Sequence, residues 1–397
     1  MSTRRTLALT LALTASAMVA VAPPVLGAGW TSPFVLRTGA SGVPLDVGDI
    51  AGTGDAVVVG WQETPPGGAM NVRVRWSTDR GAAWSATERL DTRPQREVQV
   101  DACGGSAWAV SSLQIDTSPN TWAVALDGHD LDAGIPHESS IVTTSGVARK
   151  PDIACAGTKR LAVAWFASTS SGYHVKLFSR GVILDLLGTN PPEIRRDLGS
   201  AAMKKGLAVA ASASRIYVAW FAGNDLRLKR YDLGPAPRYT LTEHPTQTVA
   251  AGIPYGLAPE LGVAGSRVLL AYTNRASLYV RTSSDGGASW SGPRRLIEEP
   301  FPSEVIAIPT NADVTGTRML VSGYEVGGDA GGVNGAGFIE ASENAGGAWS
   351  MVSGSQKVGG TAVGAFVGSG AGSRQVQAWD ETIADPAVEH IRFHRES

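Results

Sequence analysis

Ser283-Ser-Asp285-Gly-Gly287-Ala-Ser-Trp290 is the stretch that decides the fold of this chain, because its pattern occurs twice more. Ser77-Thr-Asp79-Arg-Gly81-Ala-Ala-Trp84 repeats it, and Ser342-Glu-Asn344-Ala-Gly346-Gly-Ala-Trp349 repeats it with Asn in place of Asp. The shared frame, S-x-[D/N]-x-G-x-x-W, suits a tight hairpin turn. Side-chain oxygens bond backbone N–H groups of the turn, Gly takes a positive φ, and Trp packs on the sheet.

A longer repeat surrounds these motifs. Apolar strand-like runs recur seven times, and they end at Trp61, Ser112, Trp165, Trp220, Tyr272, Tyr324 and Trp379. The steps between successive ends are 51, 53, 55, 52, 52 and 55 residues. A period of this size predicts one four-stranded propeller blade per repeat, and hence seven blades.

The third repeat illustrates the expected strands of one blade. Residues 151–156, 161–167, 173–179 and 182–187 are short runs rich in β-branched and aromatic residues, separated by turn residues. They predict four strands, the first innermost and the last outermost. No 3.6-residue apolar period of helical length follows residue 28, so we expect an all-β fold.

The two ends of the chain predict a closed ring. The last repeat supplies Val376–Trp379 and Val388–Phe393 but no outer strand. Trp30-Thr-Ser-Pro-Phe-Val-Leu36 copies Trp84–Leu90 and Trp290–Leu296, the expected fourth strands after two of the motifs. The N-terminal strand should therefore complete the last blade and leave no free edge. The alternative is an open array with a stray N-terminal strand.

The motif resembles the Asp box (BNR repeat) of the sialidase-like β-propellers. With the seven repeats, the resemblance implies a single seven-bladed propeller over residues 29–397. It also implies that the boxes join third to fourth strands, on the face opposite the ligand-binding loops. The box residues are then structural rather than catalytic: Ser77, Asp79, Gly81, Trp84, Ser283, Asp285, Gly287, Trp290, Ser342, Asn344, Gly346 and Trp349.

The catalytic pattern of the sialidases is not matched. That family has six blades, an arginine triad, a tyrosine–glutamate nucleophile pair and an aspartate acid, and its first arginine lies in an Arg-Ile-Pro motif. The nearest string here, Gly252-Ile-Pro254-Tyr255, lacks the arginine and lies in mid-chain. Other Asp-box proteins have seven blades, including xyloglucanase-like hydrolases and photosystem assembly factors that bind protein. The resemblance thus implies the fold and leaves the activity open.

Residues 1–28 are expected to be a secretory signal peptide. Arg4 and Arg5 precede an uncharged run from Leu7 to Ala22, and small residues around Ala28 suit cleavage. An uncleaved anchor and the twin-arginine export route are the alternatives. Without this segment the chain has 32 basic and 36 acidic residues, a net charge of −4, and no basic run. We therefore expect a secreted monomer that binds neither nucleic acid nor membrane.

The two cysteines lie 52 residues apart, each at the end of an expected inner strand. Cys103 and Cys155 would belong to neighbouring blades, whose inner strands converge on the channel. In an exported protein this arrangement favours a disulfide. The alternative is a pair of small buried thiols, because a bridge requires Cα atoms within roughly 7 Å.

Several loops of the expected ligand-binding face carry charged residues. The acids are Glu63, Asp116, Asp225, Asp329, Asp380 and Glu381, and the possible arginine clamps are Arg93, Arg149, Arg196 and Arg275. A glycosidase would need two carboxyls roughly 5–10 Å apart. Each residue alone is better explained as solvated surface, and we expect the arginines to be dispersed without an inward triad.

No metal or cofactor site is expected. The string Asp127-Gly-His-Asp130-Leu-Asp132-Ala-Gly134 is rich in oxygen ligands but lacks the closing Glu of an EF-hand loop. His390 and His394 are four residues apart on a strand, a spacing that does not suit one ion. The chain also lacks a phosphate-binding loop and a G-x-S-x-G elbow.

The sequence therefore favours a secreted binding module that recognises a glycan or an extracellular protein through one loop face. A sialidase-like exo-glycoside hydrolase and an exported assembly scaffold are the alternatives.

Overall fold

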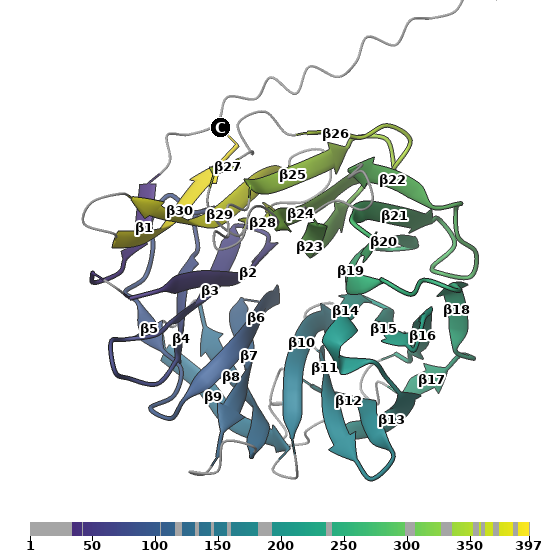
Figure 1. The fold of residues 1–397 in the computed structure, drawn as a ribbon, viewed down its shortest axis with the longest axis horizontal. Coiled ribbons are helices and arrows are strands. Elements are labelled where there is room, and N and C mark those ends of the chain that lie inside the picture. The colour runs from purple at the N-terminus through teal and green to yellow at the C-terminus, as the bar shows by residue number, and fades with distance from the viewer. Residues whose placement is uncertain are drawn as a thin grey trace, which may run out of the picture.

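The computed structural model describes residues 34–41, 43–103, 105–115, 121–131, 135–143, 147–156, 160–181, 193–235, 240–297, 306–326, 336–351, 357–358, 362–367, 373–383 and 388–396. Seven antiparallel sheets are arranged around a central axis (Figure 1). The prediction of an all-β, seven-bladed propeller is confirmed. Among these residues the only helical element is a 3-10 turn, η1 (Met203–Lys205), and none has the length and apolarity to cross a membrane as a helix. The expected signal peptide, residues 1–28, lies outside them.

Each blade is a meander that runs from the channel outward. Blades 1 to 3 are β2 (Leu45–Thr53), β3 (Ala56–Glu63), β4 (Asn71–Ser77), β5 (Glu88–Arg89); β6 (Gln95–Cys103), β7 (Ser106–Gln114), β8 (Trp122–Asp130), β9 (Ile135–Thr143); and β10 (Ala148–Ala156), β11 (Arg160–Thr169), β12 (Gly172–Gly181), β13 (Ile194–Ser200). Blades 4 and 5 are β14 (Leu207–Ser212), β15 (Arg215–Ala222), β16 (Asp225–Leu233), β17 (Leu241–Glu243), with β18 (Gln247–Ala250) also on β16; and β19 (Leu257–Ala264), β20 (Arg267–Asn274), β21 (Ser277–Ser283), β22 (Arg294–Ile297). Blade 6 is β23 (Ile306–Thr315), β24 (Arg318–Val326), β25 (Ala336–Ser342), β26 (Ser350–Met351), with β27 (Lys357–Val358) also on β25; blade 7 is β28 (Ala362–Val367), β29 (Arg374–Ile383), β30 (Val388–Arg395) and β1 (Phe34–Thr38).

The ring is closed by its first strand. In Figure 1 the purple β1 lies beside the yellow β30, and the two pair antiparallel from Phe34 opposite Phe393 to Thr38 opposite His390. The predicted closure through the last blade is confirmed: the described strand covers Phe34–Thr38, and residues 30–33 of the predicted segment lie outside the described residues. An edge strand that would otherwise remain unpaired is thereby covered.

One strand of blade 3 was placed wrongly by the sequence. The outermost strand is β13, Ile194–Ser200, which pairs with β12. The predicted fourth strand, residues 182–187, lies outside the described residues.

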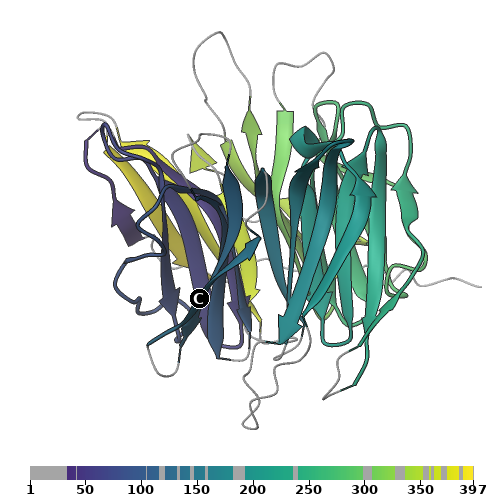
Figure 2. The same ribbon diagram turned by 90° about the horizontal axis from the view of Figure 1, so that it is seen from below.

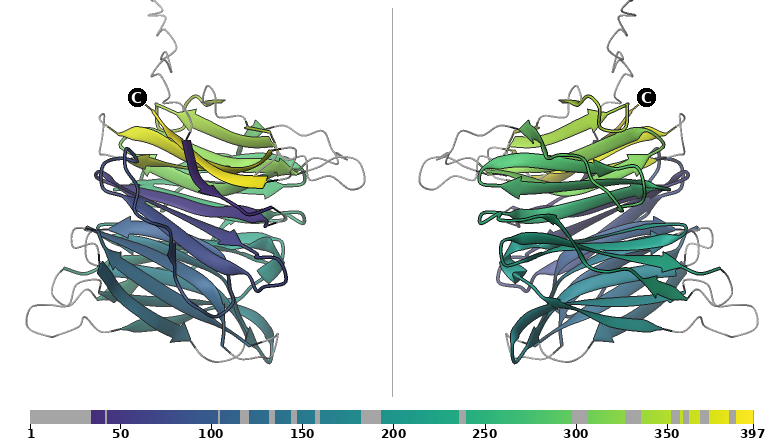
Figure 3. Two further views of the ribbon diagram at one scale, coloured as in Figure 1. Left: turned by 90° about the vertical axis from the view of Figure 1, so that its left-hand side faces the viewer. Right: turned by 90° about the vertical axis from the view of Figure 1, so that its right-hand side faces the viewer.

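The core consists of apolar layers between neighbouring blades, and Figure 3 shows the stacked blades from two sides. In β3, Val57, Val59 and Trp61 pack toward blade 7, whereas Val58 packs toward blade 2, and each is at most 2% exposed. Both faces of the sheet are therefore buried. This is why the second strands read as continuous apolar runs rather than as an alternation.

The three motif copies form closely similar turns between third and fourth strands. In the first, Ser77 Oγ accepts the Gly81 N–H at 2.8 Å and Asp79 Oδ1 accepts the Ala83 N–H at 2.8 Å. The equivalent bonds measure 2.8 and 2.9 Å around Ser283 and Asp285, and 3.0 and 2.7 Å around Ser342 and Asn344. Each Trp is partly buried and packs against a core layer.

Each of these turns also contacts the preceding blade. Trp84 packs edge-on against Phe393 of blade 7, with ring centroids 4.8 Å apart. Gly81 takes φ +81°, and a Cβ there would lie 2.5 Å from the Phe393 ring. The Gly286 carbonyl accepts a bond from Arg230 of blade 4 at 2.8 Å, and the Gly347 carbonyl accepts one from Arg294 of blade 5 at 2.6 Å. The turns thus connect blades as well as strands.

If β1 closes the ring, its buried side chain should contribute to stability. Leu36 is 3% exposed in the layer between blades 7 and 1, whereas Val35 is 38% exposed on the same strand. Leu36→Ala should lower the free energy of unfolding by about 2–4 kcal/mol, because it leaves a cavity in that layer. Val35→Ala, the matched control, should cost about 0.5 kcal/mol or less. Chemical denaturation of both variants checks this, and equal losses would argue against a closed, packed junction.

Candidate functional site

The loop face of the ring carries the turns between second and third strands and the connections from one blade to the next. In a four-stranded meander these lie at one end of the strands, and the box turns lie at the other. Figure 2 shows the two faces from the side. The loop face is where the inner strands begin, so one of the two ends of the central channel lies there.

The inner strands are irregular near this opening. Five of them have a register shift at the same place: between Val47 and Asp49, Arg96 and Gln99, Arg149 and Asp152, Leu257 and Glu260, and Pro309 and Asn311. Within three of these bulges a residue other than Gly has positive φ: Glu97 at 59°, Lys150 at 47° and Ala258 at 42°. Bulges and strained residues of this kind are common next to functional sites, because they redirect side chains.

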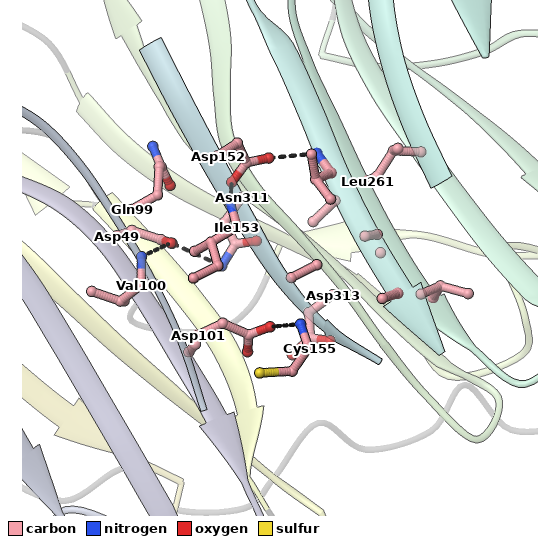
Figure 4. A pocket seen from close by; sticks show the side chains of 18 of the residues that line it. Asp49, Gln99, Val100, Asp101, Asp152, Ile153, Cys155, Leu261, Asn311 and Asp313 are labelled. Atoms are coloured by element: carbon pink, nitrogen blue, oxygen red, sulfur yellow. Dashed lines mark hydrogen bonds between the residues drawn. The ribbon is translucent and has the colours of Figure 1, made fainter. Parts of the chain in front are cut away.

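Polar residues follow the bulges and line a central cavity of about 420 Å³ (Figure 4). The first tier consists of Asp49, Gln99, Asp152, Glu260 and Asn311. Asp101 and Asp313 line the cavity two residues further along their strands. This set was not predicted from the sequence, although aspartates recur in the inner strands at the repeat spacing.

Three of these aspartates join neighbouring blades. Each uses one oxygen for the next N–H of its own strand and the other oxygen for an N–H of the following blade. Asp49 reaches Val100 N at 3.0 Å, Asp101 reaches Cys155 N at 2.6 Å, and Asp152 reaches Val209 N. These bonds, drawn in part in Figure 4, occupy both oxygens of each carboxyl group.

Burial makes these carboxyls weak acids. It raises the pKa of Asp101 and that of Asp152 to about 7, despite the backbone N–H bonds that favour the ionised form. Burial also raises the pKa of Asp49 and that of Glu260 well above the ordinary values, and the charge of Asp152 adds to the effect in both. Desolvation therefore outweighs the backbone hydrogen bonds at the three aspartates, and at Glu260 it acts in the same direction as the charges of Asp152 and Asp49.

A glycosidase acid also needs a raised pKa, but it must have an oxygen available to a substrate. The oxygens of Asp49, Asp101 and Asp152 are engaged with backbone groups, so these side chains serve as ties between blades. In the described part of the chain, no three His, Cys, Asp or Glu side chains are placed to hold one metal ion.

The predicted acids occupy different environments. Glu63 is 3% exposed and pairs with Arg37 at 3.0 Å and Arg73 at 2.7 Å. Asp225 accepts the Gly252 N–H at 3.1 Å. Asp116 and Asp329 lie outside the described residues, as do the side chains of Asp380 and Glu381 in β29. The loop expected at Asp127–Gly134 is strand β8 up to Asp130, and Asp132 lies outside the description.

The four predicted arginines belong to separate contacts. Arg93 pairs with Asp91 at 2.6 Å, and Arg149 binds Glu97 of the neighbouring blade at 2.8 Å. Arg196 and Arg275 line two different pockets, on blade 3 and near blade 5. Among the described contacts, no three of these arginines line the same pocket or bind the same group.

Two further expectations stay predictions. Cys155 lies next to the end of β10, but the side chain of Cys103 lies outside the described residues, so the disulfide is untested. For the histidine pair, Nδ1 of His390 lies 3.2 Å from Thr38 Oγ1 across the closing strand pair. The side chain of His394 lies outside the described residues.

The raised pKa values predict how stability depends on pH. With Asp101 and Asp152 near 7, the native state binds more protons than the unfolded state, in which such groups titrate near 3.8. This contribution to stability should therefore be complete below about pH 4, decline as pH rises from about 4 to 7, and level off above about 7.

Asp152→Asn should reduce that fall by about 1–3 kcal/mol between pH 5 and 8, because the amide remains neutral. Melting temperatures across this range check the prediction. Asp55→Asn, which changes a carboxylate with 59% exposure outside the channel, is the control. A profile for Asp152→Asn that runs parallel to the wild type would show that Asp152 is already ionised in the native state.

Comparisons with known proteins bear on the fold alone. No family model and no curated protein matches the chain. Among solved structures, an endosialidase of phage phi92 aligns over 93% of this chain and 69% of its own, with 10% identity and a TM-score of 0.53. A Trypanosoma rangeli sialidase aligns over 78% of this chain and 56% of its own, at 13% identity and a TM-score of 0.45. A Dyadobacter fermentans protein of unknown function aligns over 77% of this chain and 98% of its own, at 12% identity and a TM-score of 0.48.

This chain spans little more than half the length of the Trypanosoma protein, and the low identities carry no residue roles. The blade topology and the endosialidase alignment agree on architecture. In fold, the chain is a seven-bladed β-propeller that is similar to the propeller of the phage phi92 endosialidase.

Proposed function

We propose that the protein is a secreted binding module that recognises a glycan or an extracellular protein through its loop face. The observation that carries the proposal is Tyr255. This residue is 56% exposed and is the one aromatic among the exposed large apolar side chains of the described chain. Tyrosine is favoured at recognition surfaces, because a rigid ring offers contact area and its hydroxyl offers a hydrogen bond.

Tyr255 lines a pocket of about 290 Å³ at the junction of blades 4, 5 and 6. Its walls come from η1, the connection between blades 4 and 5, the turn at Arg275 and the start of β23. Lys205, Leu257, Arg275 and Ile306 contribute to it. A flat aromatic side chain beside cationic donors suits a sugar ring or an acidic or amidated side chain of a protein.

The connection that carries Tyr255 is held in place before any ligand binds. Ile253, which is 5% exposed, donates its N–H to the Asn224 carbonyl at 2.7 Å. Lys205 Nζ donates to the Pro254 carbonyl at 2.9 Å and to Asn224 Oδ1 at 3.2 Å. A recognition residue on a rigid loop loses little conformational entropy on binding, which favours affinity.

A sialidase-like hydrolase is supported less well. Such an enzyme must gather arginines around one pocket, and Arg93, Arg149, Arg196 and Arg275 make separate contacts. The channel acids have raised pKa values, but three of them use both oxygens for backbone N–H groups.

The proposal is tested with an array of sialylated and neutral oligosaccharides and with extracellular protein extracts. Tyr255→Ala should weaken any binding observed by about tenfold or more, because a central aromatic contact contributes at least about 1.4 kcal/mol. Met351→Ala is the matched control, since Met351 is 43% exposed on the strand that follows the third box turn, at the opposite face. Binding that survives Tyr255→Ala, or that falls equally in both variants, would contradict the proposal.

A further inference from the structure

The turn between β11 and β12 presents a serine on the loop face of blade 3. Thr169 pairs with Gly172, so Ser170 and Ser171 are the two residues of the turn, and both are exposed. Gly172 has φ +114°, and Thr169 Oγ1 donates to its carbonyl at 2.7 Å. Ser171 Oγ lies 3.1 Å from Thr169 Oγ1 and 3.1 Å from Nε2 of His174. A tight turn thus fixes a hydroxyl group next to an imidazole.

The other ring nitrogen of His174 faces a carboxylate. Nδ1 lies 3.1 Å from each oxygen of Asp197. An ionised carboxylate can only accept a hydrogen bond, so Nδ1 carries the proton in the neutral ring and Nε2 is the acceptor. Nε2 is then able to take the proton of Ser171 Oγ. This is the arrangement of nucleophile, base and orienting acid that activates a serine, recognised by geometry and not by order in the chain.

The strand pairing brings Asp197 to this place. Lys176 is opposite Asp197, and a register shift occurs between Val175 and Lys176 where β12 meets β13. Asp197 also accepts bonds from Lys176 Nζ at 2.6 Å and from the Gly199 N–H at 3.0 Å. Although partial burial acts in the opposite direction, the bonds from Lys176, Gly199 and His174 lower the pKa of Asp197 to about 2. The carboxylate therefore stays ionised at neutral pH.

A pocket of about 460 Å³ lies beside this group, and it is lined by Asp197 and by Thr169, whose Oγ1 lies 3.1 Å from Ser171 Oγ. Thr169, Lys176 and Asp197 form part of its wall, together with Trp165, Arg195 and Arg196. The wall has three cationic side chains and one carboxylate. A ligand that carries a negative charge is therefore favoured there.

We propose that Ser171, His174 and Asp197 form a hydrolytic site that cleaves carboxylic esters carrying an anionic group. Ser171 Oγ bonds to the ester carbonyl carbon while its proton passes to His174 Nε2. The bond from that carbon to the alcohol oxygen breaks, and the alcohol leaves with this proton. Water then gives a proton to Nε2 and adds to the acyl carbon. The bond to Oγ breaks, Ser171 recovers the proton, and a carboxylic acid leaves. Asp197 is a positioning residue, because it orients the imidazole.

This site is separate from the Tyr255 pocket, since the two belong to different blades. Either could fail without the other. The chemistry is acyl transfer, which requires neither a pair of acids across a glycosidic bond nor an arginine triad.

The experiment uses the full folded protein with two probes. One is a p-nitrophenyl ester pair, the neutral acetate and the anionic hemisuccinate, and the other is a fluorophosphonate that labels activated serines. We expect release of p-nitrophenolate with preference for the hemisuccinate, and label on the peptide that contains Ser171. Ser171→Ala should reduce turnover by about a hundredfold or more and abolish that label. Ser170→Ala, the neighbouring exposed serine, should keep both.

His174→Gln separates an activated serine from a merely accessible one. It leaves Ser171 in place, so loss of labelling in this variant shows that the imidazole activates the hydroxyl. Melting temperatures close to that of the wild type establish that the variants are folded, as expected for an exposed serine on a turn and a partly exposed histidine. Label on another residue, turnover equal in Ser171→Ala and wild type, or full labelling of Ser171 in His174→Gln would each overturn the proposal.

Discussion

The structure depends on one constraint: each blade buries both faces of its sheet, and only its neighbours can cover them. Val57 and Val58 are adjacent in β3, yet they pack into two different layers, toward blades 7 and 2. A blade with two apolar faces is not stable alone, and an open array would expose a face at each end. Closure by β1 against β30 solves both problems at once, because it completes the last sheet and supplies Leu36 to the layer between the last blade and the first.

Polar contacts set the spacing of the blades that these layers hold together. On the box face, each box turn contacts the blade before it. Arg230 of blade 4 donates to the Gly286 carbonyl of one turn, and Arg294 of blade 5 donates to the Gly347 carbonyl of another. In the channel, an aspartate reaches the blade after it, as Asp49 does to Val100. The two kinds of tie differ in their electrostatic cost. The box carboxylates lie near the surface, and hydrogen bonds lower the pKa of Asp285, with the bond from Ser289 foremost. The channel carboxyls are desolvated, and their pKa values rise.

The rigid ring explains why the loop face is suited to recognition. Its turns begin and end in strands that are fixed by burial on both faces, so Tyr255 and Ser171 are presented on short, hydrogen-bonded segments rather than on mobile loops. Small irregularities in the strands then place the side chains. Bulges at Glu97, Lys150 and Ala258 turn polar residues into the channel, and the register shift in β12 brings Asp197 opposite Lys176 and within reach of His174.

The sequence by itself determined the architecture, because repeat length, box motif and the copied N-terminal strand are local patterns that reflect blade size, turn geometry and ring closure. It also located the box turns, whose hydrogen bonds join residues two to four positions apart. The outer strand of blade 3 was misplaced, since an apolar run such as residues 182–187 carries no information on where the chain reverses. The channel acids could have been noticed from their spacing, but not their pKa values, which depend on burial. Tertiary structure alone decided which side chains meet: Asp197 lies 23 residues from His174 and joins it only through the pairing of β12 with β13, and the walls around Tyr255 come from three blades.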